Sequence, residues 1–92
     1  MIISFVHKGL EKFYQTGNKA GIIAEHASRL RVILSNLDMA ETPNCVNLPG
    51  LALHSLKGDK SGFWSVKVSG NWRIIFAFTD KNIELVDYLD YH

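Results

Sequence analysis

Cysteine is nearly absent from the sequence, which holds only Cys45 among its 92 residues. A single thiol cannot form a disulfide within the chain, and it cannot supply the paired cysteines of a zinc site. Its neighbours, Asn44 and Val46, give no reason for a lowered thiol pKa, so we expect an ordinary reduced side chain. Metal-binding motifs such as HExxH are also missing, and neither a metal nor another cofactor is expected.

Long hydrophobic runs are missing as well. No stretch approaches the length of a membrane span, and the first residues lack the charged, apolar and small-residue order of a signal peptide. We therefore expect a cytoplasmic protein that makes no contact with a membrane. A chain of 92 residues with 47% hydrophobic content can form one core, which predicts a single domain over residues 1–92.

What is present is a strong strand pattern in residues 53–78. In its last third, Trp72, Ile74 and Phe76 alternate with Arg73 and Ile75, the period of two that is typical of a half-buried strand. Polar turns at residues 57–62 and 69–71 divide the stretch into three parts. The pattern predicts three antiparallel strands, with one apolar face that another part of the chain must cover.

The remaining segments supply that cover. Residues 2–6 form a short apolar run that predicts a strand, and Leu10 and Phe13 recur at helical spacing before a stop at residues 16–18. A longer amphipathic helix is predicted over residues 23–37. In the last predicted strand, Ile83 and Leu85 are expected to share a face.

The expected order is thus strand, helix, helix and four strands. This is an α+β domain, with two helices on one face of a mostly antiparallel sheet and the other face open to solvent or a ligand.

Charge is balanced over the whole chain but not along it. Residues 53–78 carry four basic side chains and one acid, whereas residues 79–92 carry four acids and one lysine. The basic side chains are Lys57, Lys60, Lys67 and Arg73. A basic sheet face is compatible with phosphate binding, which makes Lys60 and Lys67 candidates for RNA contacts, although such charges often serve only solubility.

Two regions hold candidate catalytic groups. His54 lies within a predicted strand, whereas His7 and His26 lie near the helices, where no partner is expected for them. The chain ends in Asp90, Tyr91 and His92, without the Gly, Ser or Lys residues of a solvated tail. If the last strand pairs within the sheet, these three residues emerge at its end, near the face that carries His54.

Such a group could perform acid–base chemistry without a metal. Histidine, with a reference pKa of about 6.5, can take a proton from a ribose 2′-OH or protonate the 5′ oxygen that leaves. Fixed cations could stabilise the charge on phosphorus. The same residues could equally form a Tyr–Asp–His hydrogen-bond network that only fixes the end of the chain.

Four short motifs resemble one known family. They are HSLKGD at residues 54–59, GFWSV at 62–66, NWRI at 71–74 and DYH at 90–92. Together with MIISF and HKGL near the start, they are similar to the HigB branch of the RelE/ParE toxin superfamily, also called plasmid-maintenance killer proteins. The similarity covers essentially the whole chain.

The resemblance implies a microbial ribonuclease-like fold and a ribosome-dependent mRNA endoribonuclease that acts in the 30S A site. It also implies a HigA-type helix-turn-helix antitoxin as partner, with operator DNA reached only through the complex. Residue by residue, it implies a catalytic set and two residues at the RNA phosphate. The catalytic set is His54, Asp90, Tyr91 and His92, and the phosphate-binding pair is Lys57 and Arg73.

Two other functions stay open on this fold. The ParE branch implies a non-catalytic inhibitor of DNA gyrase, and a third alternative is an inactive co-repressor. The ending DYH favours the ribonuclease over the inhibitor. One position departs from the family, because the turn before Asn71 is Ser69-Gly70, where relatives often carry a basic residue.

Overall fold

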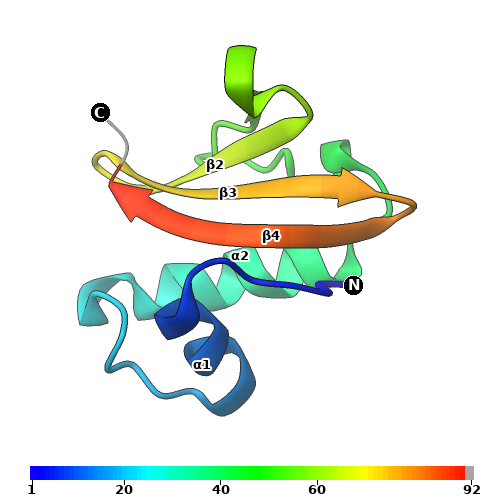
Figure 1. Ribbon diagram of the computed structural model, residues 1–92. Helices are drawn as coiled ribbons and strands as arrows, with labels where there is room; N and C mark the ends of the chain where they lie inside the picture. Colours follow the sequence, from blue (N-terminus) through cyan, green and yellow to red (C-terminus); the bar gives the residue numbers. More distant parts are fainter. Residues whose placement is uncertain (91–92) are drawn as a thin grey trace.

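The computed structural model describes residues 1–90; Tyr91, His92 and the side chain of Lys60 lie outside the described part. Two α-helices and four strands make up the fold, joined by three short 3-10 turns (Figure 1). In chain order the elements are α1 (Lys8–Thr16), η1 (Ala24–His26), α2 (Ala27–Met39), η2 (Pro43–Val46), β1 (His54–Ser55), η3 (Gly58–Lys60), β2 (Phe63–Ser69), β3 (Trp72–Thr79) and β4 (Asn82–Asp90).

The four strands form one antiparallel sheet in the order β1-β2-β3-β4. Figure 1 shows α1 and α2 together on one side of this sheet, with α2 running beneath β4 and β3. The predicted α+β class, with both helices on one face, is confirmed. The predicted first strand is reduced to two isolated parallel bridges, Ile2 with Ile83 and Phe5 with Val86, beside β4.

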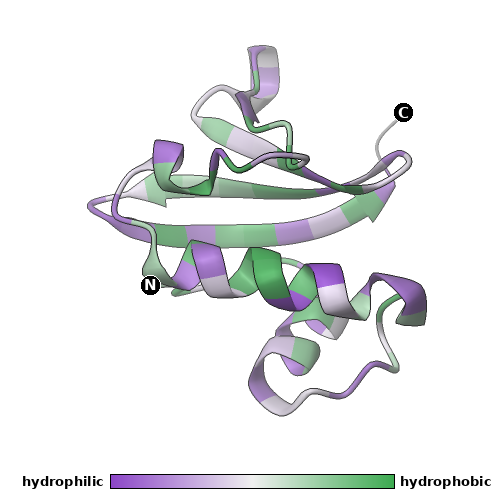
Figure 2. Cartoon of the chain, turned by 180° about the vertical axis from the view of Figure 1, so that it is seen from behind, coloured by the Kyte–Doolittle hydropathy of each residue, from purple (hydrophilic) through white to green (hydrophobic). Residues whose placement is uncertain are grey.

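The core lies between α2 and the sheet. Leu30, Ile33 and Leu37 of α2 are buried there against Ile74 and Phe76 of β3. Along β4, buried side chains alternate with more exposed ones over much of its length. Figure 2 shows bands of hydrophobic and hydrophilic residues along the strands. The predicted cover of the apolar sheet face by the longer helix is thus observed.

Capping side chains position the helices. His7 precedes α1, and its Nδ1 accepts the Leu10 amide at 2.9 Å, so the expectation that His7 lacks a partner is wrong. Gly17 ends α1 in the left-handed region, at φ 79°, where glycine avoids a steric clash. The longer helix, expected from residue 23, begins as the turn η1 and becomes α-helical at Ala27.

A β-bulge corrects the predicted face of Leu85. The pairing of β3 with β4 shifts between Ile75 and Ala77, and Leu85 adopts φ 56°. The shift turns Leu85 outward, where it is 41% exposed, and buries Val86 in its place.

Among residues 1–90, no helix is long and apolar enough to span a membrane.

Candidate functional site

A row of four residues crosses the sheet face that points away from the helices. Register pairs His54 with Ser65, Ser65 with Ile75, and Ile75 with Asp87, and directly opposed residues share a face. Ser65 and Ile75 are only 3% and 2% exposed, so the centre of this row is shielded from water. The face expected to be open is therefore open only in part, with His54 exposed at one end.

Two hydrogen bonds orient the His54 ring. Its Nδ1 lies 3.3 Å from the carbonyl oxygen of Ala52, and its Nε2 lies 3.4 Å from Oγ of Ser65. A carbonyl oxygen only accepts, so Nδ1 carries the proton, and Nε2 then accepts from the serine hydroxyl. The ring thus presents Nε2 as a base: the Ala52 carbonyl sets the tautomer, and the neighbour Ser65, which the sequence did not single out, helps to orient the ring.

The next row brings two predicted cations together. Lys67 is the register partner of Arg73, and Arg73 is in turn the partner of Leu89. Arg73 is half-buried, and its Nη1 is buried without a hydrogen-bond partner. No ion pair to Arg73 is found among residues 1–90. Because no carboxylate among the described residues neutralises the Arg73 guanidinium, its positive charge is available to attract an anion.

The other predicted site residues are less closely grouped. Lys57 is exposed and precedes the turn η3, two residues beyond β1. Asp90 is the register partner of Trp72, so it lies on the helix side of the sheet, on the strand furthest from β1. The described residues do not bring Asp90 beside His54. Tyr91 and His92, the other two members of the predicted catalytic set, fall outside the described residues.

A second group of rings lies behind Asp90, on the helix side. The Tyr88 hydroxyl is 2.6 Å from Nδ1 of His26, and the Trp72 ring packs against Tyr88 with centroids 4.7 Å apart. His26 also meets both rings edge-on. His26 therefore has a positioned partner, contrary to expectation, and joins η1 to the end of β4.

Burial raises the pKa of the Tyr88 hydroxyl above its ordinary value of 10.0, against a smaller lowering by a hydrogen bond with the backbone of Ile23.

The thiol of Cys45 also differs from the expectation of an ordinary pKa. A hydrogen bond with the Thr42 side chain, followed by backbone hydrogen bonds at Glu41 and Thr42, lowers the pKa of its exposed thiol.

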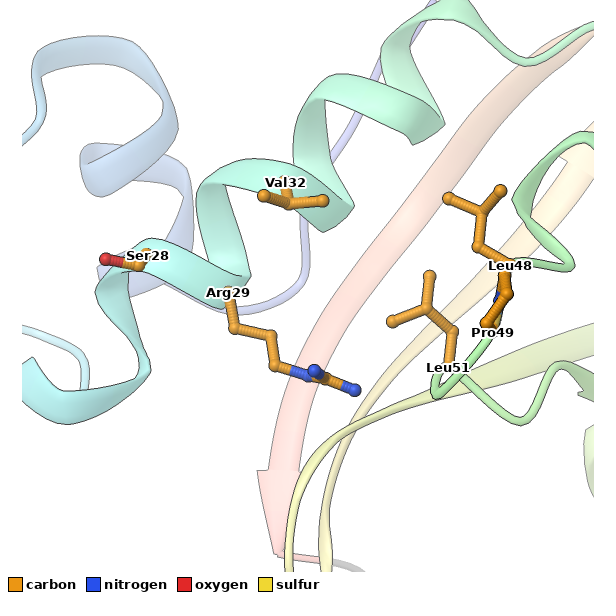
Figure 3. Close-up of a pocket in the computed structure, with 6 residues that line it drawn as sticks. All are labelled: Ser28, Arg29, Val32, Leu48, Pro49 and Leu51. Atoms are coloured by element: carbon orange, nitrogen blue, oxygen red, sulfur yellow. The ribbon is translucent and has the colours of Figure 1, made fainter.

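An apolar pocket lies between α2 and the loop before β1. Its volume is about 290 Å³, and it is lined by Ser28, Arg29, Val32, Leu48, Pro49 and Leu51 (Figure 3). Arg29 reaches across from α2, and its Nη2 donates to the Gly50 carbonyl at 2.7 Å. The pocket is separate from the row of residues that contains His54.

The described residues hold no cluster of three or more His, Cys, Asp or Glu side chains placed to bind a metal ion.

Comparison with known proteins identifies the family. A family model described as "RelE-like toxin of type II toxin-antitoxin system HigB" matches residues 3–92. The chain belongs to this HigB family. The family suggested by the sequence motifs is thereby confirmed.

Two curated relatives are similar over the full length of this HigB-family chain. Endoribonuclease HigB of Proteus vulgaris is 39% identical over 92 residues, which is all of both chains. Toxin HigB-1 of Vibrio cholerae serotype O1 is 31% identical over 94 residues, covering all of this chain and 98% of the relative.

Solved structures show the same fold at lower identity. The chain superposes on a structure of the YoeB-YefM complex from Staphylococcus aureus with a TM-score of 0.64 at 20% identity, covering 100% of this chain and 95% of the other. YafQ from E. coli gives a TM-score of 0.57 at 19% identity, with 96% and 89% covered. These likenesses agree with the RelE-like architecture of the HigB family.

Proposed function

We propose that this toxin is an endoribonuclease that cuts mRNA on the ribosome and so inhibits translation. The proposal draws on its full-length similarity to a relative named Endoribonuclease HigB. The observation that carries it is Arg73, which forms no ion pair among the described residues and whose register neighbour is the cation Lys67. An unneutralised guanidinium on the same sheet face as His54 suits a phosphodiester better than it suits a packed core.

The proposed reaction needs no cofactor, because RNA carries its own nucleophile. His54, with Nε2 unprotonated, takes the proton from a ribose 2′-OH while the 2′ oxygen forms a bond to the neighbouring phosphorus. The bond from phosphorus to the 5′ oxygen breaks, and this oxygen takes a proton from the end of the chain. The products are a 2′,3′-cyclic phosphate and a free 5′-OH.

The other site residues have electrostatic and proton-transfer roles in this proposal. Lys57 and Arg73 stabilise the negative charge that builds up on the phosphorane oxygens. Asp90, Tyr91 and His92 supply the acid and its hydrogen-bond partners. His54 lies on β1 and Asp90 on β4, at opposite edges and on opposite faces of the sheet, so in this proposal Asp90 does not itself touch the phosphate on which His54 acts.

The proposed partners follow from the family. A HigA-type helix-turn-helix antitoxin would bind and neutralise the toxin, and operator DNA would be reached only through that complex. One of the similar solved structures is a heterotetrameric complex of the YoeB-YefM toxin-antitoxin from Staphylococcus aureus. The 30S A site with its mRNA would be the target of the free toxin in the cytoplasm.

The test is to map 5′ ends of a reporter mRNA in a reconstituted translation system, with and without ribosomes. We expect cuts within codons only while ribosomes translate. Inhibition of DNA gyrase without RNA cleavage would instead favour a ParE-like inhibitor, and no inhibition of either process would favour an inactive co-repressor.

The first variant to make is His54→Ala. We expect cleavage to fall by about 10²- to 10⁴-fold, the usual contribution of a positioned general base. The fold should remain intact, because His54 is exposed. Rates of mRNA cleavage and a thermal melt measure the two effects.

The matched control is Ser55→Ala, which changes the next exposed residue of β1. It should cleave at the unmodified rate. Full activity of His54→Ala would remove His54 from the proton-transfer role.

A further inference from the structure

A second basic site lies on the helix side of the turn between β2 and β3. A hollow of about 440 Å³ is lined there by Glu25, His26, Arg29, Lys67, Val68, Ser69 and Gly70. It meets the sheet face that carries His54 at Lys67, which belongs to that face and also lines the hollow. We propose that this hollow binds a backbone phosphate of RNA as a second anchoring subsite, an inference that rests on the proposed ribonuclease function.

Two cations border the hollow without being neutralised. Arg29 and Lys67 are both exposed, and neither forms an ion pair with another residue of the described chain. The bond from Arg29 Nη2 to the Gly50 carbonyl fixes the direction of the guanidinium but uses only one of its five N–H donors. Glu25 is the one acid in the lining, so the local balance is positive.

The third polar group of the hollow is held rigidly. His26 is fixed at Nδ1 by the Tyr88 hydroxyl, and the Trp72 and Tyr88 rings meet it edge-on. Its other ring nitrogen, Nε2, has no hydrogen-bond partner among residues 1–90. In the tautomer in which Nδ1 accepts from the Tyr88 hydroxyl, Nε2 carries the proton, and a donor whose orientation is already fixed loses little entropy when a phosphate oxygen binds.

The hollow is continuous with the proposed cleavage site. Lys67 is the register partner of Arg73 and also lines the hollow, so it joins the two basic regions. In the neighbouring row, Ser69 pairs with Trp72, and Trp72 pairs with Asp90. A strand of RNA bound at Arg73 and running past this end of the sheet would meet Lys67 and then Arg29. This continuity favours RNA over an acidic protein segment.

The test measures how the affinity for RNA depends on salt. Binding is followed by fluorescence anisotropy with two probes: a labelled single-stranded mRNA blocked at its 2′ positions, and 30S subunits carrying the same mRNA. For single strands, each phosphate contact that is lost lowers the slope of log affinity against log salt by about 0.7. We expect this change for Lys67→Gln and for Arg29→Gln, together with a several-fold weaker affinity at low salt.

Control variants separate charge from structure. Arg29→Lys keeps the charge and should retain the slope. Arg31→Gln removes a cation from the same helix, where Arg31 lies over the Phe13 ring. This variant should leave the salt slope of RNA binding unchanged. If Arg29→Gln disturbs the fold, Lys67→Gln still decides the question, because Lys67 is exposed and forms no ion pair within residues 1–90.

Each outcome has a definite meaning. A changed slope with isolated RNA assigns the subsite to the message, and a change only with 30S subunits assigns it to ribosomal RNA. Unchanged slopes with both probes, while the unmodified chain still cuts mRNA, would overturn the subsite and leave the proposed function standing. Weaker antitoxin binding in place of weaker RNA binding would also overturn it, whereas an unmodified chain that neither binds nor cuts RNA would refute both proposals.

Discussion

His54 is held by a neighbour that is far from it in sequence. Alternation along the chain could predict which face of the sheet carries His54, because that depends only on the strand period. It could not predict Ser65 as the neighbour of Nε2, since that contact depends on the register between β1 and β2. A serine in an alternating strand is expected to face water, yet Ser65 is 3% exposed. The same limit applies to His26 and Tyr88, which are 62 residues apart.

The Tyr88 hydroxyl offers a test of that distant contact. In Tyr88→Phe the ring remains but the bond to His26 is lost, which should cost about 1 kcal/mol, or roughly 4–8 °C in Tm. Denaturant unfolding at neutral pH measures the change. The mutation Ser28→Ala, at an exposed position of α2, should stay within about 0.5 kcal/mol of the unmodified protein. A Tyr88→Phe protein as stable as the control would mean that the hydroxyl contributes nothing to folding.

Tyr88 should also leave a signature at high pH. Its folded pKa is raised, so the fold favours the neutral hydroxyl, and this contribution is complete below pH 10.0, the ordinary tyrosine value. The contribution is lost as the pH rises through the folded pKa. The free energy of unfolding should therefore fall above pH 10 less steeply in Tyr88→Phe than in the unmodified protein. Parallel curves would contradict the raised pKa.

The helix α1 packs unusually closely against the loop that follows it. A Cβ built on Gly9 would lie 2.5 Å from the Gly21 carbonyl oxygen, and one built on Gly21 would lie 2.5 Å from Cα of Gly9. Both obstacles are backbone atoms, which cannot rotate away. Sequence patterns could predict α1 from Leu10 and Phe13, but they give no sign that Gly9 is required by a contact with a glycine twelve positions later.

This contact reverses the usual effect of replacing a helical glycine. Gly9→Ala would normally stabilise a helix by up to about 1 kcal/mol. Here we expect it to destabilise the protein by roughly 1–3 kcal/mol, the range for overpacking. A lower urea midpoint with an unchanged slope is the expected result. Gln15→Ala, at an exposed position of the same helix, should be near neutral, and a more stable Gly9→Ala protein would disprove the close contact.

The molecule as a whole follows the predicted plan more closely than its details do. Long periodic segments such as β3 and α2 decide the class of the fold, and they were predictable because the strand and helix periods are local properties. The bulge that turns Leu85 outward could not be predicted from the sequence, since it depends on how β4 fits both β3 and the N-terminal segment. Likewise, the sequence suggested that Asp90 emerges near the face that carries His54, whereas the register of β4 assigns Asp90 to the other face.

One carboxylate ties the N-terminal segment to the rest of the fold. Oδ1 of Asp38, in α2, accepts from the Ile2 amide at 3.0 Å and from the Tyr14 hydroxyl at 2.9 Å. Asp38→Ala should cost about 1–3 kcal/mol, the range for hydrogen bonds to a charged group. The amides of Ile3 and Val86, which bond between this segment and β4, should lose protection from hydrogen exchange.

The isosteric variant Asp38→Asn keeps an oxygen at this position and should retain most of that protection. If the amides of Ile3 and Val86 were as protected from hydrogen exchange in Asp38→Ala as in the unmodified protein, the N-terminal segment would be held by its pairing with β4 alone.

That pairing has a consequence for the order in which a newly made chain can fold. Oγ of Ser4 accepts from the amide of Leu85, 81 residues later, so the N-terminal segment, although tied to Asp38 of α2, cannot complete its pairing until β4 has been made. Contacts over such distances form late, because a long loop must close first. β4 also ends in Asp90. While this chain is still being synthesised, its sheet therefore cannot be complete, because β4, which pairs with both β3 and the N-terminal segment, is made last.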